Sequence, residues 1–195
     1  MCYYLLRKTY INNVWYKIDK AYASAPWYIH KQAVTSYSPI EWNYCTKASY
    51  TVRKRPTFPW RYTIDVNNYA EDVDGNVFGG PLCASVGGWR RNANSSKLAV
   101  APCFLPKLFD GPYWVVHYDE SEGYALISGG QPTKDTGNGC TTGTRTNNSG
   151  LWIFLRTPQR DDEKVAMVEQ LAINAGFDTS VLNDVIHQDC SYDEE

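Results

Sequence analysis

Short runs rich in β-branched and aromatic residues recur through most of this chain, separated by turn signals at nearly regular spacing. This rhythm predicts an antiparallel β sandwich or barrel. We expect eight strands, at residues 27–34, 45–53, 60–71, 77–87, 97–104, 113–119, 123–129 and 151–156. Eight such strands, each followed along the chain by its neighbour in the sheet, are typical of an up-and-down barrel. Such a barrel removes exposed sheet edges by closing on itself. The predicted fold class is therefore all-β, an eight-stranded antiparallel barrel.

The segments between these strands carry turn signals with a physical basis. Asp74 and Gly75 allow the positive φ of a tight hairpin. Pro56 and Pro59 interrupt the link between the second and third strands, because proline cannot donate to a sheet ladder. The stretch 133–150 is so rich in Gly, Thr and Asn that we expect a long surface loop without a strand.

One α-helix is expected after the last strand, packed outside the barrel. Asp161, Asp162 and Glu163 place negative charge at its first turn, where the helix dipole favours it. An apolar face then recurs at helical spacing, made of Val165, Val168, Leu171, Ala172 and Ala175. Gly176 is the expected C-terminal cap.

The ends of the chain differ from the barrel in composition. Residues 1–26 form an arm in which Tyr and Trp alternate with Arg and Lys, residues 27–190 hold the barrel and helix, and residues 191–195 are an acidic tail. The arm either packs across the closed end of the barrel or binds a partner, since Tyr and Trp are common in interface cores. The start of the chain does not have the pattern of a signal peptide, so we expect either that targeting residues have been removed from it or that the start is incomplete.

Composition excludes several classes of function. The formal net charge of -2 implies neither nucleic acid nor an anionic membrane as a partner, and no apolar run reaches the ~18 residues of a membrane-spanning helix. The three histidines lie far apart, and the six cysteines include no Cys-x-x-Cys pair, so we expect no metal site. An even number of cysteines favours disulfides and an oxidising compartment, although six reduced buried thiols remain an alternative.

Several motifs, in order along the chain, resemble those of the lipocalin family. The likeness is greatest to its apolipoprotein D, plant and bacterial branch, and it covers residues 24–190. The matching motifs are Ala25–Ile29, Cys45–Val52, Lys97–Val100, Phe104–Pro106, Gly111–Val116, Tyr124–Ile127, Leu151–Pro158 and Gly176–Ser180. The chain departs from the family at Ala25, where a glycine is usual, and in the long insertion before Leu151.

The resemblance implies a barrel whose floor is closed by Trp27, with the guanidinium of Arg156 across its ring. It also implies a small hydrophobic ligand, because lipocalins bind lipids, retinoids, bilins and carotenoids. Strand alternation places one set of side chains inside. This predicted cavity set is Ala48, Tyr50, Tyr62, Ile64, Leu98, Val100, Val116, Leu126 and Trp152. A barrel filled by its own aromatic side chains, with no ligand, is the alternative.

Three disulfide pairings are expected. Cys83 and Cys103 are equally distant from Ala93, the middle of the intervening hairpin loop, so a symmetric hairpin would place them opposite each other. The resemblance implies a bridge between Cys45 and Cys190. Cys2 and Cys140 are then left to tie the arm to the long loop.

Three functions follow as hypotheses. The first is noncovalent binding of a carotenoid, chlorophyll or lipid, in the thylakoid lumen or in a secreted or periplasmic setting. The second is a subunit that docks on a pigment-bearing membrane protein complex through residues 1–26 and 133–150. The third rests on a further resemblance, to the lipocalin domain of violaxanthin de-epoxidases. This resemblance would make Glu41 a catalytic acid for epoxide opening. Acidic side chains are rarely buried, however, so we expect Glu41 to be an exposed loop residue without a catalytic role.

Overall fold

The computed structural model describes residues 2, 22–86 and 96–192. Most of this part of the chain is β-structure. The longer strands are β1 (Trp27–Ala33), β2 (Tyr44–Val52), β3 (Ile64–Glu71), β4 (Val77–Val86), β5 (Lys97–Ala101), β6 (Gly111–Asp119), β7 (Tyr124–Ser128) and β10 (Leu151–Leu155). Shorter elements are η2 (Ile40–Trp42), η3 (Lys107–Phe109), β8 (Lys134–Asp135), β9 (Cys140–Thr141), η4 (Thr179–Val181) and β11 (Leu182–Asp184).

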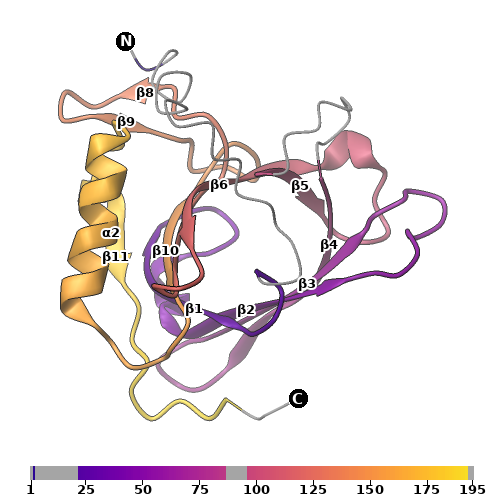
Figure 1. The fold of residues 1–195 in the computed structure, drawn as a ribbon, viewed down its shortest axis with the longest axis horizontal. Helices are drawn as coiled ribbons and strands as arrows, with labels where there is room; N and C mark the ends of the chain where they lie inside the picture. Colours follow the sequence, from indigo (N-terminus) through magenta and orange to yellow (C-terminus); the bar gives the residue numbers. More distant parts are fainter. Residues whose placement is uncertain (1, 3–21, 87–95, 193–195) are drawn as a thin grey trace.

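The longer strands form a closed barrel. Within the described residues the sheet order is β10-β7-β6-β5-β4-β3-β2-β1-β11, and β10 also pairs with β1. That last pairing, which sets Tyr28 opposite Leu155 and Ile29 opposite Phe154, closes the cylinder. Figure 1 shows the ring of strands with β11 and the helix outside it. The predicted eight-stranded antiparallel barrel is confirmed.

Two strands are shorter than predicted by three residues or more, and in each case a backbone constraint explains where the strand begins or ends. The third strand begins at Ile64 rather than at residue 60, because Arg61 has a φ of 60°, which no extended strand accommodates. The fifth ends at Ala101 rather than at residue 104, because Pro102 has no N–H to donate to the ladder.

The prediction that residues 133–150 contain no strand was wrong. Strands β8 and β9 pair within this loop, with Lys134 opposite Thr141, because Cys140 is fixed by hydrogen bonds on both its backbone groups to Gly176 and Asp178. The sequence also gave no signal for β11, which pairs with the second half of β1. Strand β2 pairs only with the first two residues of β1, so the rest of that edge is left for β11.

The helix α2 (Asp162–Asn174) begins and ends as expected. The Asp161 side chain accepts a hydrogen bond from the Lys164 N–H at the N-cap. At the other end Gly176 has a φ of 85°, and its N–H and that of Phe177 bond to the carbonyls of Ile173 and Ala172. This pair of bonds is a Schellman motif, which glycine favours because it has no Cβ.

The helix creates a second core on the outside of the barrel. Its buried residues Val165, Val168 and Ala172 pack against β7 and β10. The outer core is made of Ala33, Tyr124, Leu126, Leu151, Ile153, Leu155, Val165, Val168, Ala172, Ala175 and Phe177. The inner core, the buried cluster centred on the barrel interior, is made of Tyr22, Trp27, Ile29, Ala48, Tyr50, Ile64, Val66, Ala84, Leu98, Val115, Tyr118, Ala125, Ile127, Phe154 and Val185. No helix among the described residues is long and apolar enough to cross a membrane.

Candidate functional site

The floor of the barrel is a contact between an indole and a guanidinium. Trp27, the first residue of β1, is fully buried, and the Arg156 guanidinium carbon lies 3.6 Å from the centre of its ring. The same guanidinium donates to the backbone oxygens of Ala25 and Tyr22 and forms an ion pair with Glu120 at 2.8 Å. A cation over an indole face that is shielded from water is attractive by up to ~2 kcal/mol. The chain is therefore held closed at this end by one residue pair.

Most of the predicted cavity residues do point into the barrel. Six of them belong to the inner core or pack directly against it, namely Ala48, Tyr50, Ile64, Leu98, Val100 and Trp152. The other three lie elsewhere: Val116 and Leu126 pack in the outer core, and Tyr62 packs in a separate small cluster.

Two of these three corrections arise from the strands that face the helix. The register of β6 shifts between Val115 and His117, so alternation is interrupted and Val116 packs on the outer face. Every residue of β7 is buried, because α2 covers its outer face, and its inward residues are Ala125 and Ile127 rather than Leu126. A strand that is apolar on both faces has no alternation from which the inner face could be predicted.

The third correction concerns Tyr62, which lies before β3 and not in it. Its ring packs against the disulfide of Cys83 and Cys103, and its hydroxyl donates to the Leu105 carbonyl at 3.0 Å and to Asp110 at 2.6 Å. This tyrosine therefore joins two loops on the outside of the barrel.

The structure adds a polar feature that strand alternation did not reveal. Three tyrosine hydroxyls meet in the inner core: those of Tyr22 and Tyr113 lie 2.8 Å apart, and those of Tyr50 and Tyr113 lie 2.7 Å apart. Tyr113 alternates with the inward Val115 on β6, so strand parity could have found it. Tyr22 precedes β1 and has no periodic signal, and its burial inside the barrel shows that the barrel core includes part of the predicted arm, residues 1–26.

Burial keeps these hydroxyls neutral. It raises the pKa of Tyr50 to about 12 and the pKa values of Tyr22 and Tyr113 well above the usual value for tyrosine. The tyrosine triad, as we call Tyr22, Tyr50 and Tyr113, is therefore a group of neutral donors and acceptors surrounded by apolar side chains. It can hydrogen-bond a carbonyl or hydroxyl group.

Glu41, the residue of the enzyme hypothesis, is an exposed member of η2. A catalytic acid acts on a substrate that is held in a site closed to water, and the exposed position of Glu41 provides no such site. The geometry therefore gives no support to a role for Glu41 in epoxide opening.

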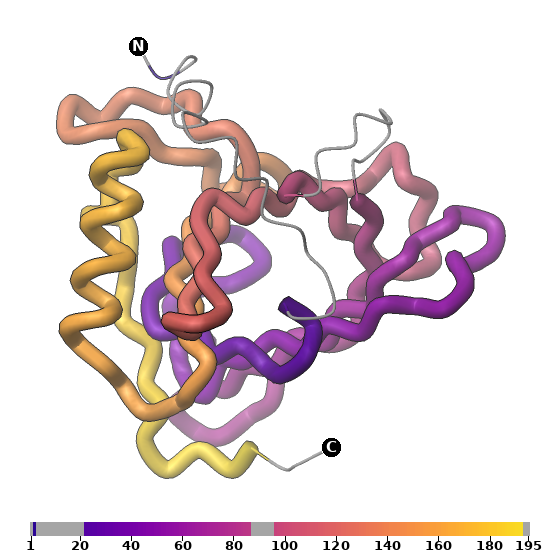
Figure 2. Tube along the Cα trace, viewed as in Figure 1, coloured from indigo at the N-terminus to yellow at the C-terminus, as the bar shows by residue number. Residues whose placement is uncertain are grey.

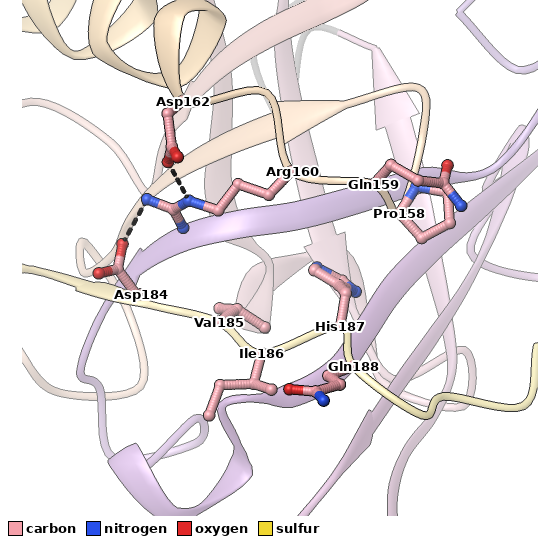
Figure 3. Close-up of a pocket in the computed structure, with 9 residues that line it drawn as sticks. All are labelled: Pro158, Gln159, Arg160, Asp162, Asp184, Val185, Ile186, His187 and Gln188. Atoms are coloured by element: carbon pink, nitrogen blue, oxygen red, sulfur yellow. Dashed lines mark hydrogen bonds and ion pairs between the residues drawn. The ribbon is translucent and has the colours of Figure 1, made fainter.

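A surface pocket of about 580 Å³ lies beside the barrel, between the start of α2 and the C-terminal segment (Figure 3). Arg160 spans it and bonds to Asp162 at 2.7 Å and Asp184 at 2.9 Å. The His187 ring donates from Nε2 to the Ile29 carbonyl at 2.9 Å. Each of these groups is already bonded to a neighbouring residue, so the arrangement fits a joint between segments better than a reactive site.

All six cysteines form disulfides, which join Cys2 to Cys140, Cys45 to Cys190 and Cys83 to Cys103. The argument that placed Cys83 opposite Cys103 was wrong in register, because Cys83 pairs with Ala101 in the ladder. Asp65 lies near the sulfurs of this bridge, but sulfurs bonded to each other are not thiolate ligands for a metal.

Comparison with known proteins places this fold. No family model matches the chain. Temperature-induced lipocalin-1 from Arabidopsis thaliana is 33% identical over 95 residues, which are 47% of this chain. The match covers 42% of the length of that relative, which is less than half. Apocrustacyanin C2 superposes with a TM-score of 0.62 at 17% identity, over 97% of this chain and 87% of that one. Insecticyanin from the tobacco hornworm Manduca sexta superposes with a TM-score of 0.56 at 13% identity, over 90% and 82%.

Proposed function

We propose that this chain, which has the lipocalin fold, binds one small and mostly apolar molecule inside its barrel. The observation that carries the proposal is the inner core, where apolar side chains from the barrel strands surround the neutral tyrosine triad. An eight-stranded barrel is just wide enough to hold one small ligand, and ligand sites combine apolar walls with a few placed polar groups.

The ligand we propose is a carotenoid, another pigment such as chlorophyll, or a lipid, held without a covalent bond. The triad favours a molecule with a carbonyl or hydroxyl at one end, because a pure hydrocarbon would leave those hydroxyls without a new partner. The structural likeness to apocrustacyanin and insecticyanin supports the fold on which this proposal rests, a closed barrel.

Two measurements test this function. An organic extract of the protein purified from its source, analysed by absorbance and mass spectrometry, is expected to contain one apolar compound. Titration of the emptied protein with all-trans-retinol, followed by quenching of tryptophan fluorescence, is expected to saturate at one site. A protein that yields no compound and shows no saturable binding to retinol or to a fluorescent fatty acid would contradict the proposal.

The Tyr113→Phe variant tests the role of the triad. Removing one hydroxyl that bonds the ligand is expected to weaken retinol binding about ten-fold, the effect of a single hydrogen bond. Binding of an apolar hydrocarbon probe should not change. The matched control is Tyr37→Phe, whose hydroxyl bonds to the Ser149 carbonyl away from the inner core. Equal retinol affinity in the two variants would remove the triad from the site.

We also propose that the protein works in an oxidising compartment, with the thylakoid lumen or the secretory route as the two settings. The three disulfides support this, since such bonds persist where thiols are oxidised. Asn147 is exposed and begins an Asn-Asn-Ser glycosylation signal, so the two settings can be told apart. A glycan at Asn147, detected as a mass lost on treatment with peptide-N-glycosidase, would place the protein in the secretory route and contradict the lumen.

A further inference from the structure

Two loops on the outside of the barrel expose large apolar side chains. One loop, residues 53–63, connects β2 to β3, and the other, residues 102–110, connects β5 to β6 and contains η3. They lie side by side on the right of Figure 2. We call their exposed apolar residues the aromatic platform, with the exposed fractions Phe58 97%, Phe104 78%, Leu108 74% and Phe109 56%.

The platform is held in place by contacts beneath it. The Trp60 indole donates to the Phe104 carbonyl at 3.2 Å, and the Tyr62 hydroxyl donates to the Leu105 carbonyl. The bridge of Cys83 and Cys103 fastens the second loop to β4. Because these bonds fix both loops, the exposure of the platform is a property of the fold and not of loose loops. Soluble monomers rarely expose such groups together without an interaction that uses them.

Positive charge surrounds the same side chains. The two loops contain Arg53, Lys54, Arg55, Arg61 and Lys107, of which Arg53 is paired with Asp65 of β3 at 2.6 Å. Against these five cationic residues they contain one acidic residue, Asp110, whose carboxylate accepts the Tyr62 hydroxyl. The whole chain has a formal net charge of -2, so this basic rim is a local concentration of charge.

A second exposed apolar pair provides a contrast. Val73 and Val77, at the turn between β3 and β4, are 73% and 61% exposed, yet they lie among Glu71, Asp72 and Asp74. Exposed apolar groups with acidic neighbours would be repelled by an anionic surface, whereas those with basic neighbours would be attracted to it.

We propose that the aromatic platform docks the protein on the surface of a bilayer that contains anionic phospholipids. Phenyl and leucyl side chains enter the boundary between headgroups and acyl chains, while Lys and Arg around them contact the lipid phosphates. The exposed phenyl groups are spread over two loops, with Phe58 in one and Phe104 and Phe109 in the other. This spread suits insertion between lipids better than the packed, fully buried centre of a protein interface does. Docking of this kind would bring the barrel close to the bilayer interior, in which apolar molecules dissolve.

The experiment is flotation of the intact protein with vesicles of phosphatidylcholine alone or mixed with phosphatidylglycerol. We expect about ten-fold more protein on the mixed vesicles, and loss of that binding at high salt, because Lys and Arg are attracted to an anionic surface and salt screens that attraction. The triple variant Phe58→Ser, Phe104→Ser, Leu108→Ser is expected to lose the binding. The control variant Val73→Ser, Val77→Ser is expected to keep it.

A second variant separates charge from insertion and protects against misfolding. Lys54→Glu, Arg55→Glu, Arg61→Glu retains every platform side chain and is expected to abolish the preference for anionic vesicles. Near-UV circular dichroism and the absence of free thiols report that each variant is folded. Equal flotation of wild type and platform variant would overturn the proposal. Failure of the wild type to bind mixed vesicles would also overturn it and would favour an acidic protein as the partner.

Discussion

Trp27 and Arg156 illustrate how single side chains hold this barrel together. The guanidinium lies over the indole ring and also donates to three backbone oxygens of the segment that precedes β1, those of Tyr22, Ala25 and Pro26. The indole in turn donates to the Tyr22 carbonyl, which fixes the position of the tyrosine. Arg156 therefore closes the barrel floor and, together with the Trp27 indole, holds Tyr22 of the tyrosine triad in place.

Replacing Arg156 by Ala is expected to lower the free energy of unfolding by about 2–4 kcal/mol. The variant loses the contact with the indole and leaves carbonyls without their donor. Urea denaturation followed by fluorescence measures this directly. Arg55→Ala, at an exposed position in the loop after β2, is the control and should change stability by less than about 0.5 kcal/mol. Equal effects of the two changes would show that the guanidinium does not stabilise the floor.

Two histidines predict how stability depends on pH. Their rings are 4.7 Å apart, and burial lowers the pKa of His187 to about 4 and also lowers the pKa of His30. Histidines in the unfolded chain take up protons near pH 6.5, so below that pH the unfolded state binds more protons than the folded state. The stability provided by the neutral rings is therefore complete above about pH 6.5 and is lost progressively as the pH falls toward about 4.

Urea midpoints measured at intervals between about pH 7.5 and pH 5 check this dependence on histidine protonation. The midpoint should be constant at the upper end and fall below about pH 6.5, and the fall should be smaller in His187→Gln. A midpoint that does not change across this range, or an unchanged fall in the variant, would rule out the histidine pair as the cause.

At the scale of elements, the sequence predicts well those parts whose two faces differ. The strands that expose one face to solvent showed their alternation, and α2 showed both its caps and its apolar side. The sequence could not predict the inner face of β7, where helix and barrel core bury both sides, nor the bulge that moves Val116 outward. Strand β11 has only three residues, and its pairing depends on the free edge of β1, which is a tertiary property.

The outer core predicts a difference between two neighbouring positions on α2. Val168 is fully buried against the barrel, and Met167 is 38% exposed. Val168→Ala is expected to lower the free energy of unfolding by about 2 kcal/mol, because the lost methyl groups leave a cavity. Met167→Ala should have little effect. Comparable losses in the two variants, measured by urea denaturation, would mean that the helix does not pack as described.

At the scale of the whole molecule, the fold and the site differ in how far the sequence determines them. Strand rhythm and family motifs were sufficient for the closed barrel, the helix and the paired cysteines. The site depends on which side chains converge inside, and six of the nine predicted cavity residues do so. Tyr22 was assigned to an arm because residues before β1 have no repeating pattern, and only the closed barrel brings its hydroxyl to Tyr113. The partner hypothesis for the rest of that arm, residues 3–21, lies outside the described residues and stays a prediction.

The central claim, that the ligand lies inside the barrel, is tested most directly by methyl NMR during a titration with all-trans-retinol. The inner and outer cores provide separate sets of methyl groups in one molecule. The inner reporters are Ile64, Val66, Leu98, Val115 and Ile127, and the outer reporters are Leu126, Leu151, Leu155, Val165 and Val168. We expect the inner signals to shift and saturate while the outer signals stay in place. Shifts confined to the outer set, or no shifts in either set, would contradict the account.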